Sequence, residues 1–314
     1  MGRGERGDLS DAEWERLRPF LPVSNGRCGR WRDHRQVIDG ILHRVRTGVH
    51  WRDLPERFGP WKTVYERHRL WSADGTWERL LQQVQAAADA SGQIDWDVSV
   101  DSTIVRAHQH AAGARTDPPS ALVDSKGDEA LEHQGESPWQ SLAGRLVEVG
   151  AGGEGLGRSR GGFTSKIHLS ADGLCRPLSL IVTPGQRADC TQFVPVLEKI
   201  RVPRLGSGRP RNKPDSVAAD KAYSNGPCRQ HLRRRGIRHT IPEKADSQVA
   251  RLRRGPRGGR PPGFDEERYK KRNTVERAIN KLKNSRAVAT RYDKRGYVFL
   301  GTVTAAALVI WLRT

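Results

Sequence analysis

IDWDVSVDSTIVRA, residues 94–107, alternates apolar and polar side chains over its first eight positions. A period of two predicts a β-strand with one buried face, and we expect this strand to end at Asp101. An acid at the tip of a buried strand is unusual unless it is paired, caps the next element or binds a ligand. For Asp101 alone, capping and ligand binding are equally good interpretations.

The chain downstream of this strand predicts a sheet with helices around it. TSKIHLSADG (164–173) and LCRPLSLIVTPG (174–185) have the pattern of a hairpin joined at an Asp-Gly turn. A short buried strand in SVAADKAYS (216–224) ends at Asp220, for which capping is again the alternative. The remaining predictions are helices at 189–200, 226–235, 265–283 and near the C-terminus, and a strand at 237–242. A hairpin followed by alternating strands and helices predicts an α/β fold with a mixed sheet flanked by helices.

The chain upstream predicts helices only. Ser10 and Glu13 form a capping box at the start of a helix over 9–22, and an apolar stripe predicts a second helix over 34–47. Residues 51–71 have the pattern of a helix-turn-helix, with a short helix, a turn at Gly59 and a longer helix from Trp61. A last amphipathic helix spans 77–90.

Basic residues of the longer helix are candidates to face DNA: Lys62, Arg67, His68 and Arg69. An ordinary helical bundle with basic outer faces explains the same pattern equally well. The tryptophans of this region favour a core over a base-stacking platform: Trp51, Trp61, Trp71 and Trp77. The sequence thus predicts a helical, helix-turn-helix-like DNA-binding domain over 1–92 and a second domain over 93–314. The second contains a flexible insertion at about 111–162 and a basic disordered loop at about 245–265.

Net charge indicates the partner. The 314 residues carry a formal charge of +19, with a pI near 10.5. Residues 201–260 hold seventeen Lys and Arg against four Asp and Glu, which is most of the excess. Such a surface favours nucleic acid and predicts steeply salt-dependent binding. A solvated basic surface or an anionic membrane surface is the alternative.

Cysteine spacing and hydropathy exclude several classes. Cys28, Cys175, Cys190 and Cys228 lie far apart without a CxxC pair, which argues against zinc and disulfide frameworks. The first residues have no apolar run typical of a signal peptide. The apolar stretch 298–311 is shorter than the roughly 18–20 residues of a membrane span. We therefore expect a cytoplasmic protein that makes no membrane contact.

A charged row marks one helix face in ERYKKRNTVERAINKLK. On a helical wheel Tyr269, Arg272, Glu276 and Lys283 project within an arc of about 60°. A solvated charged face is the commoner explanation of such a row. Together with Asp101 and Asp220, however, Glu276 completes the set of carboxylates required for phosphoryl transfer with two metal ions about 3.5–4 Å apart.

The same residues resemble transposases of the insertion sequence 5 family. Tyr269, Arg272, Glu276 and Lys283 match its Y-(2)-R-(3)-E-(6)-K signature without a gap. DSTIVRAHQHAAGAR (101–115) resembles the first-aspartate segment. ADKAYS (219–224) resembles the second, usually GDKGYS, with alanines in place of both glycines. Residues 40–71 are similar to the family's N-terminal region.

The resemblance implies an RNase H-like core in which Asp101, Asp220 and Glu276 are the catalytic DDE triad. These acids would bind two Mg²⁺ or Mn²⁺ ions, cut double-stranded DNA at the element's ends and join the 3′-hydroxyl to target DNA, without a covalent protein–DNA intermediate. The implied DNA contacts are Tyr269, Arg272, Lys283, Lys221 and basic residues of the N-terminal helices at the terminal inverted repeats. Assembly on two DNA ends implies a homodimer in the synaptic complex, associated with the nucleoid.

Two other functions stay open at this point. A catalytically inactive remnant or repressor would bind the same DNA without cutting it, and a two-metal nuclease would cut without joining. His108 and His110 form an HxH pair, for which a structural or DNA-proximal role is a better interpretation than metal binding.

Overall fold

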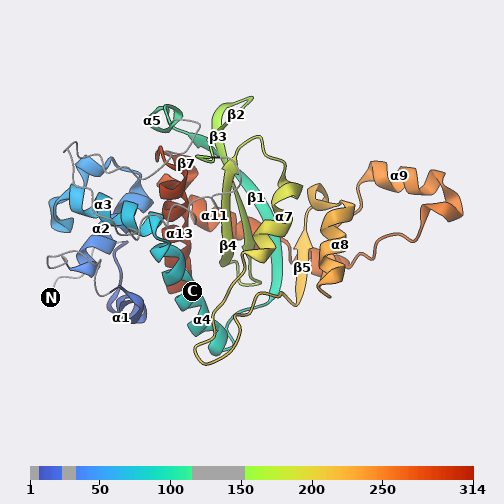
Figure 1. Ribbon diagram of the computed structural model, residues 1–314, viewed down its shortest axis with the longest axis horizontal. Helices are drawn as coiled ribbons and strands as arrows, with labels where there is room; N and C mark the ends of the chain where they lie inside the picture. The colour runs from blue at the N-terminus through green and yellow to red at the C-terminus, as the bar shows by residue number, and fades with distance from the viewer. Residues whose placement is uncertain (1–6, 23–32, 115–152) are drawn as a thin grey trace, which may run out of the picture.

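The computed structural model describes residues 7–22, 33–114 and 153–314. A group of N-terminal helices lies on one side and a mixed sheet on the other, with the C-terminal helix between them (Figure 1). This confirms the mixed α/β sheet with flanking helices and the helical N-terminal region.

Local sequence signals explain the N-terminal helices. Ser10 and Glu13 form the predicted capping box, with each side chain hydrogen-bonded to the backbone of the other. Gly48 ends the second helix in the left-handed conformation, at φ 71°, where a residue without Cβ is favoured. The short helix expected near residue 53 is instead two 3₁₀ turns. The elements are α1 (Asp11–Leu17), η1 (Arg18–Phe20), α2 (His34–Thr47), η2 (Trp51–Asp53), η3 (Glu56–Phe58), α3 (Trp61–Ala73) and α4 (Thr76–Ala90).

Seven strands form one mixed sheet. β1 pairs antiparallel with β3 and parallel with β5, which in turn pairs parallel with β6. The predicted hairpin is confirmed, because β4 pairs antiparallel with β3. The strands are β1 (Asp97–Ala107), β2 (Gly157–Ser159), β3 (Gly162–Ala171), β4 (Pro177–Pro184), β5 (Ser216–Ala219), β6 (Arg238–Thr240) and β7 (Thr290–Arg291).

Helices cover both faces of this sheet. α7 packs against β3 and β4, whereas α11 contacts β1 and β3 and α13 contacts β4. Burial on both faces explains why nearly every residue of β3 and β4 is buried. The helices that follow the N-terminal group in the described chain are α5 (Gln109–Ala112), α7 (Asp189–Glu198), η4 (Lys221–Tyr223), α8 (Gly226–Arg234), α9 (Ala245–Arg253), η5 (Gly255–Gly258), α10 (Glu266–Lys270), α11 (Asn273–Lys283), α12 (Arg286–Ala289) and α13 (Gly296–Leu312).

Three sequence-based expectations are wrong in detail. Asp101 does not end its strand, because β1 continues to Ala107 through its pairing with β3. The helix over 265–283 is broken between α10 and α11, since hydrogen bonds spanning three residues replace those spanning four around Lys271. The basic loop is not irregular throughout: α9 forms there, supported by the ion pair of Arg251 with Glu243 at 3.0 Å.

The expected flexible insertion at 111–162 falls mainly on residues 115–152, which lie outside the described residues. Its last part is ordered, because β2 pairs antiparallel with β3.

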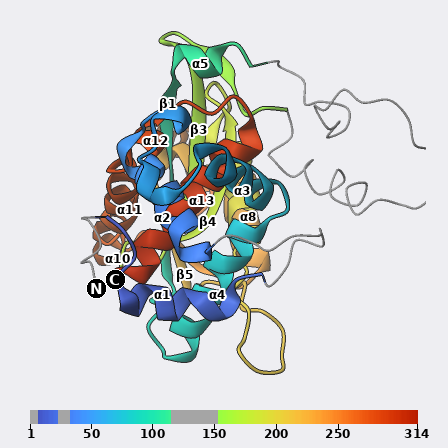
Figure 2. The same cartoon turned by 90° about the vertical axis from the view of Figure 1, so that its left-hand side faces the viewer.

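α13 is the central helix of the molecule. It contacts α2, α3 and α4 on one side and β4 on the other, so the N-terminal helices and the sheet share it (Figures 1 and 2). Trp71 and Trp77 pack edge-to-face with ring centroids 5.2 Å apart and are fully buried, which confirms their expected place in the core. Trp51 and Trp61 are half-buried against it.

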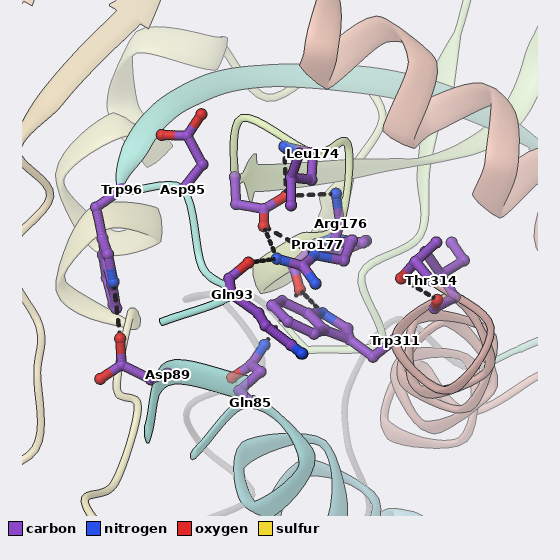
Figure 3. Close-up of polar contacts among 12 residues, drawn as sticks. Gln85, Asp89, Gln93, Asp95, Trp96, Leu174, Arg176, Pro177, Trp311 and Thr314 are labelled. Carbon is purple, nitrogen blue, oxygen red and sulfur yellow. Dashed lines mark hydrogen bonds and ion pairs between the residues drawn. The ribbon is translucent and has the colours of Figure 1, made fainter. Parts of the chain in front are cut away.

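A buried polar cluster ties α13 to α4 and to the β3–β4 turn (Figure 3). The carbonyl oxygen of Pro177 accepts hydrogen bonds from Trp311 Nε1 at 2.6 Å and from Gln85 Nε2 at 3.1 Å. Arg176 stacks on the Trp311 ring and pairs with the buried carboxylate of Asp172 at 2.6 Å. Each buried polar group is thereby satisfied across three elements.

α13 is apolar but shorter than a membrane span. Among the described residues, none of the helices combines the length and the apolar character that crossing a bilayer requires.

Candidate active site

The pairing of β1 with β5 brings two acids together. The strands run parallel, with Val100 opposite Ala219 as the last pair of the register. Asp101 is the next residue along β1, and Asp220 is the residue that directly follows β5. Parallel neighbours lie about 4.8 Å apart, so the two acids start from adjacent points of the sheet.

Beyond this point β1 has an open edge. β5 leaves at Ala219, and β7 joins the same strand only at Arg106. Among the described residues, the backbone of β1 between Asp101 and Val105 therefore has no strand partner on that side. Lys283 Nζ reaches into this gap and donates a hydrogen bond to the carbonyl oxygen of Ile104 at 3.2 Å.

α11 lies along β1 and carries the third acid. Its apolar face is buried against the sheet, and Thr274 Oγ1 donates to Ser99 Oγ at 3.2 Å. The buried positions recur at helical spacing: Val275, Ala278, Ile279 and Leu282. This docking places Glu276 and Arg272 on the margin of the helix beside Asp101.

Arg272 bridges two of the acids. Its Nη1 lies 3.4 Å from Asp101 Oδ2, and its Nη2 makes a close ion pair with Glu276 Oε1. Burial raises the pKa of Asp101, and the nearby Asp220 and Glu276 carboxylates add to this, whereas Arg272 acts in the opposite direction. The three acids thus lie within electrostatic range of one another.

The donor chemistry suits a hard divalent cation, because all three side chains are carboxylates. Their present positions suit it less well. Within the described ranges, no three His, Cys, Asp or Glu side chains are gathered closely enough to hold a metal ion. Asp101 Oδ1 accepts from the Ser102 amide at 2.8 Å, and Asp220 Oδ1 accepts from the Lys221 amide at 2.5 Å. Arg272 occupies Asp101 and Glu276, so ion binding by these acids requires Arg272 to release at least one of them.

The other predicted residues of this region lie around the acids. Lys221 is exposed directly after Asp220. Tyr269 is on α10, not on the helix of Glu276, but its ring lies 5.6 Å from the Arg272 guanidinium. Burial lowers the pKa of Lys283. The charged row is therefore split between two helices and is still assembled beside β1.

The N-terminal candidates divide into two pairs. Lys62 and Arg69 are exposed on α3. Arg67 and His68 are buried, so the expectation that they face solvent is wrong. Arg67 contacts His34 at 3.2 Å, and His68 lies between Trp77 and Thr302. Their basic character favours an outer face, but the Arg67 guanidinium packs on Trp71 and the His68 ring packs against Trp51 and Trp77.

Sequence reasoning missed a polar cluster beside the acids. Ser102 Oγ donates to Asp189 Oδ1 at 2.7 Å, and Lys166 Nζ lies 2.9 Å from the same oxygen. Burial raises the pKa of Tyr223, whose ring lies close to these groups. Asp189 is the first residue of α7, and no local signal links it to β1, because the contact depends on how α7 crosses the sheet.

Comparison with known proteins identifies the family. Residues 93–311 match the family described as "Transposase DDE domain", and residues 9–81 match "Putative transposase of IS4/5 family". The chain belongs to the DDE transposases of the IS4/5 type. The match covers every strand of the sheet and the three acids, and it confirms the resemblance seen in the sequence.

Three relatives illustrate the range of similarity. The chain is 33% identical over 151 residues, 48% of its length and all of the relative, to a "Putative transposase for insertion sequence element IS6501" of Brucella ovis. It is 43% identical over 108 residues to "Uncharacterized protein y4sN" of Sinorhizobium fredii, covering 34% of this chain and 82% of the relative. It is 35% identical over 80 residues to a "Putative transposase for insertion sequence element IS402" of Burkholderia cepacia, 26% of this chain and 38% of the relative. No solved structure matches this transposase.

Proposed function

We propose that this transposase cuts DNA at the ends of its insertion sequence and joins the freed 3′ ends to target DNA. The observation that carries the proposal is the grouping of three acids at the open edge of β1, where Asp220 follows the strand beside Asp101 and Arg272 joins Asp101 to Glu276. Asp101, Asp220 and Glu276 are the proposed catalytic triad. The mixed sheet with β1 at its centre supports an RNase H-like core, in a catalytic domain over 93–314 that follows a DNA-binding domain over 1–92.

The triad would hold two Mg²⁺ or Mn²⁺ ions. Ions bound there would lower the pKa of an attacking water and neutralise charge on the leaving oxygen. The carboxylates of this chain position that chemistry, and Arg272 is within reach of a phosphate oxygen once it releases an acid. Its planar guanidinium suits the two equatorial oxygens of a phosphoryl group.

Two displacements at phosphorus follow from this arrangement. In the first, water oxygen bonds to phosphorus and the bond to the 3′ oxygen breaks, leaving a 3′-hydroxyl and a 5′-phosphate. In the second, the 3′-hydroxyl oxygen loses its proton and bonds to the phosphorus of a target phosphodiester. The bond from that phosphorus to the target's 3′ oxygen breaks, and the leaving 3′ oxygen takes up a proton. No side chain becomes bonded to DNA in either step.

Basic residues and one tyrosine around the triad would bind the DNA backbone. Lys221, Tyr269 and Lys283 lie next to the acids, and Lys62 and Arg69 project from α3 toward solvent. We assign the first group to phosphates near the scissile bond and the second to the terminal inverted repeats. Joining two ends in one reaction further implies a homodimer in the synaptic complex.

The test is a cleavage and strand-transfer assay with the full chain, labelled DNA carrying the element's ends, and Mg²⁺ or Mn²⁺. Glu276→Gln is expected to abolish nicked and joined products while DNA binding persists, and calorimetry is expected to show weaker binding of Mn²⁺. Glu267→Gln is the matched control, because Glu267 is exposed on α10 and pairs only with Lys270 in its neighbourhood. Specific DNA binding without cleavage in either metal would show an inactive remnant or a repressor. Nicking without joined products would show a nuclease.

A further inference from the structure

A pocket lies where the N-terminal helices, α5 and the start of α13 meet. We call it the α5 pocket. The catalytic proposal leaves it unused, yet it contains one of the two histidines of the HxH pair. Its lining comes from separate parts of the chain: Arg44, Gly48–Trp51, Tyr65, His110, Tyr292–Arg295 and Val298.

Aromatic rings form the walls of the α5 pocket. Trp51 and Tyr65 lie 5.5 Å apart between ring centroids, on η2 and α3. Tyr292 also lines the pocket, and its ring lies 4.9 Å from that of His108. His110 and His50 complete the set of rings, with their centroids 5.0 Å apart. Several flat rings at the rim of one pocket suit a planar aromatic ligand, such as a nucleobase.

A buried cation lies between these walls. The Arg44 guanidinium is 5.2 Å from the Trp51 ring and 5.6 Å from the Tyr292 ring, and the residue is 3% exposed. Its Nε and Nη1 have no hydrogen-bond partner among the described residues. A buried guanidinium with free donors is unusual, and an anionic oxygen is the acceptor that would satisfy it.

The pocket carries more positive than negative charge. Lys294 is exposed at its mouth and has no ion-pair partner within the part of the chain that the structure describes. Asp293 is the single carboxylate of the lining, and it is already engaged, with Thr302 Oγ1 at 2.9 Å and Arg44 at 3.5 Å. Arg295 pairs with Glu154 outside the pocket at 2.8 Å. Arg44 therefore pairs with Asp293 through Nη2 and has Nε and Nη1 left over, whereas the charge of Lys294 has no carboxylate partner among the described residues.

The position of the pocket relates it to the catalytic acids. β7, which precedes Tyr292, pairs with the end of β1 at Arg106 and Ala107. Ala107 is six residues beyond Asp101, or about 20 Å along a strand. Lys283 covers the open edge between the two points. A DNA strand that follows this edge from the acids would reach the pocket after about six nucleotides at 3.4 Å each.

We propose that the α5 pocket binds one nucleotide of the DNA, with its base stacked against the aromatic rings that line the pocket and its phosphate at Arg44 and Lys294. That the nucleotide belongs to the element's DNA rests on the proposed function. The affinity of the pocket for a nucleotide is independent of that function. Binding one nucleotide away from the acids would fix the register of the strand in the active site.

The experiment measures binding of deoxyadenosine 5′-monophosphate to the full chain by equilibrium dialysis. Lys294→Ala is expected to weaken this binding about tenfold, as loss of a charged hydrogen bond does. Tyr65→Leu is expected to weaken it by a similar factor without changing the binding of inorganic phosphate, because it removes only a stacking partner. Arg18→Ala, which removes an exposed cation on η1, is the charge-matched control and is expected to bind like wild type.

Three results would overturn the inference. They are no difference between Lys294→Ala and Arg18→Ala, equal affinity for inorganic phosphate and the nucleotide, and failure of element-end DNA to displace the nucleotide. The last result would show that the pocket takes a free nucleotide. These outcomes are independent of strand transfer. A chain that joins DNA but does not bind the nucleotide would contradict only the inference about the pocket. A chain that binds the nucleotide but neither cuts nor joins DNA would contradict only the proposed function.

Discussion

Arg272 is the residue on which the state of the proposed active site depends. It contacts both Asp101 and Glu276 and is held in turn beside the Tyr269 ring. In this state it neutralises acids that would otherwise repel one another. When cations bind to those acids, the same guanidinium becomes available to a phosphate. One side chain would thus stabilise the folded site and act on the substrate.

Removal of this guanidinium is the first prediction. Arg272→Ala is expected to lower the single-turnover rate of DNA cleavage by about 10²–10³-fold, because the variant has no preorganised donor to the reacting phosphate. DNA affinity is expected to change far less, since many other cations contact the backbone. Arg277→Ala serves as the control, because Arg277 is exposed on α11 next to Glu276. Rates within about twofold of each other for the two variants would exclude a role for Arg272 in the reaction.

At this scale the sequence predicted the acids but not their neighbours. Asp101, Asp220 and Glu276 were selected by strand pattern, helix face and family signature, which are all local properties. Asp189 contacts Ser102 across the sheet, and no periodicity encodes such a contact. Arg67 was misplaced for a related reason: a long basic side chain can bury its stem and plane against an aromatic ring.

At the scale of elements, α9 is the least expected feature. It buries no residue and lies away from the sheet, beyond α8 (Figure 1). Residues 244–260, which we call the basic arm, hold six Lys and Arg against one Asp. An element without a core contributes little to folding stability, so its charge can serve another purpose. We predict that the arm contacts DNA phosphates.

The salt dependence of DNA binding tests the arm. The double variant Arg253→Gln with Arg257→Gln is expected to reduce the slope of log affinity against log salt by roughly 2, because each phosphate that a cation neutralises adds about 0.9 to the slope. Both residues are exposed, so the thermal unfolding of the variant should match wild type. An unchanged slope would show that the arm does not bind DNA. Replacing Arg251 is avoided, because it pairs with Glu243 and supports α9.

Element prediction succeeded where the signal was local. The second helix was predicted with its observed limits, since Asp33 caps its first turn and Gly48 ends it. β7 was not predicted, because two residues carry no period and form a strand only by pairing with Ala107 and its neighbour. The break before α11 is hidden because the helical pattern continues across it. Tyr269 and Glu276 share a face on an ideal helical wheel, and only the backbone hydrogen bonds reveal the turn between them.

At the scale of the whole molecule, α13 joins the two parts of the chain. Gly301 is a point of close approach to α3, because a Cβ there would lie 2.6 Å from the Cβ of Ser72. Gly301→Ala is expected to destabilise the fold by about 1–3 kcal/mol, as overpacking does. Ser72→Gly removes the clashing side chain. Adding Gly301→Ala to a Ser72→Gly chain should therefore cost less stability than adding it to wild type. Denaturant unfolding followed by two probes measures both effects, and a Gly301→Ala chain as stable as wild type would contradict this close packing.

Buried histidines make the stability of the whole molecule depend on pH. His68 Nδ1 accepts a hydrogen bond from Trp77 Nε1 at 3.1 Å, and its Nε2 contacts Thr302 Oγ1 at 3.0 Å. Thr302 donates its own proton to Asp293, so it accepts from His68 Nε2. This leaves His68 neutral, and a second proton on Nδ1 would break the bond to Trp77. Burial lowers the pKa of His68 to about 4, and burial also lowers that of His168 to about 4.

The direction of the effect follows from linkage. Between about pH 6.5 and pH 4 the unfolded chain takes up protons at these histidines and the folded chain does not, so their contribution to stability is complete above about pH 6.5 and declines as the pH falls. At about 1.4 kcal/mol for each pH unit, His68 alone should remove about 2 kcal/mol between about pH 6.5 and pH 5. Asp39 opposes this, because burial raises its pKa to about 6 and favours the folded state in acid.

The test is therefore a comparison of the slopes of unfolding free energy against pH. His68→Gln is expected to unfold more easily at neutral pH and to lose less stability on acidification than wild type. Equal slopes in the two chains would show that His68 is not the titrating group.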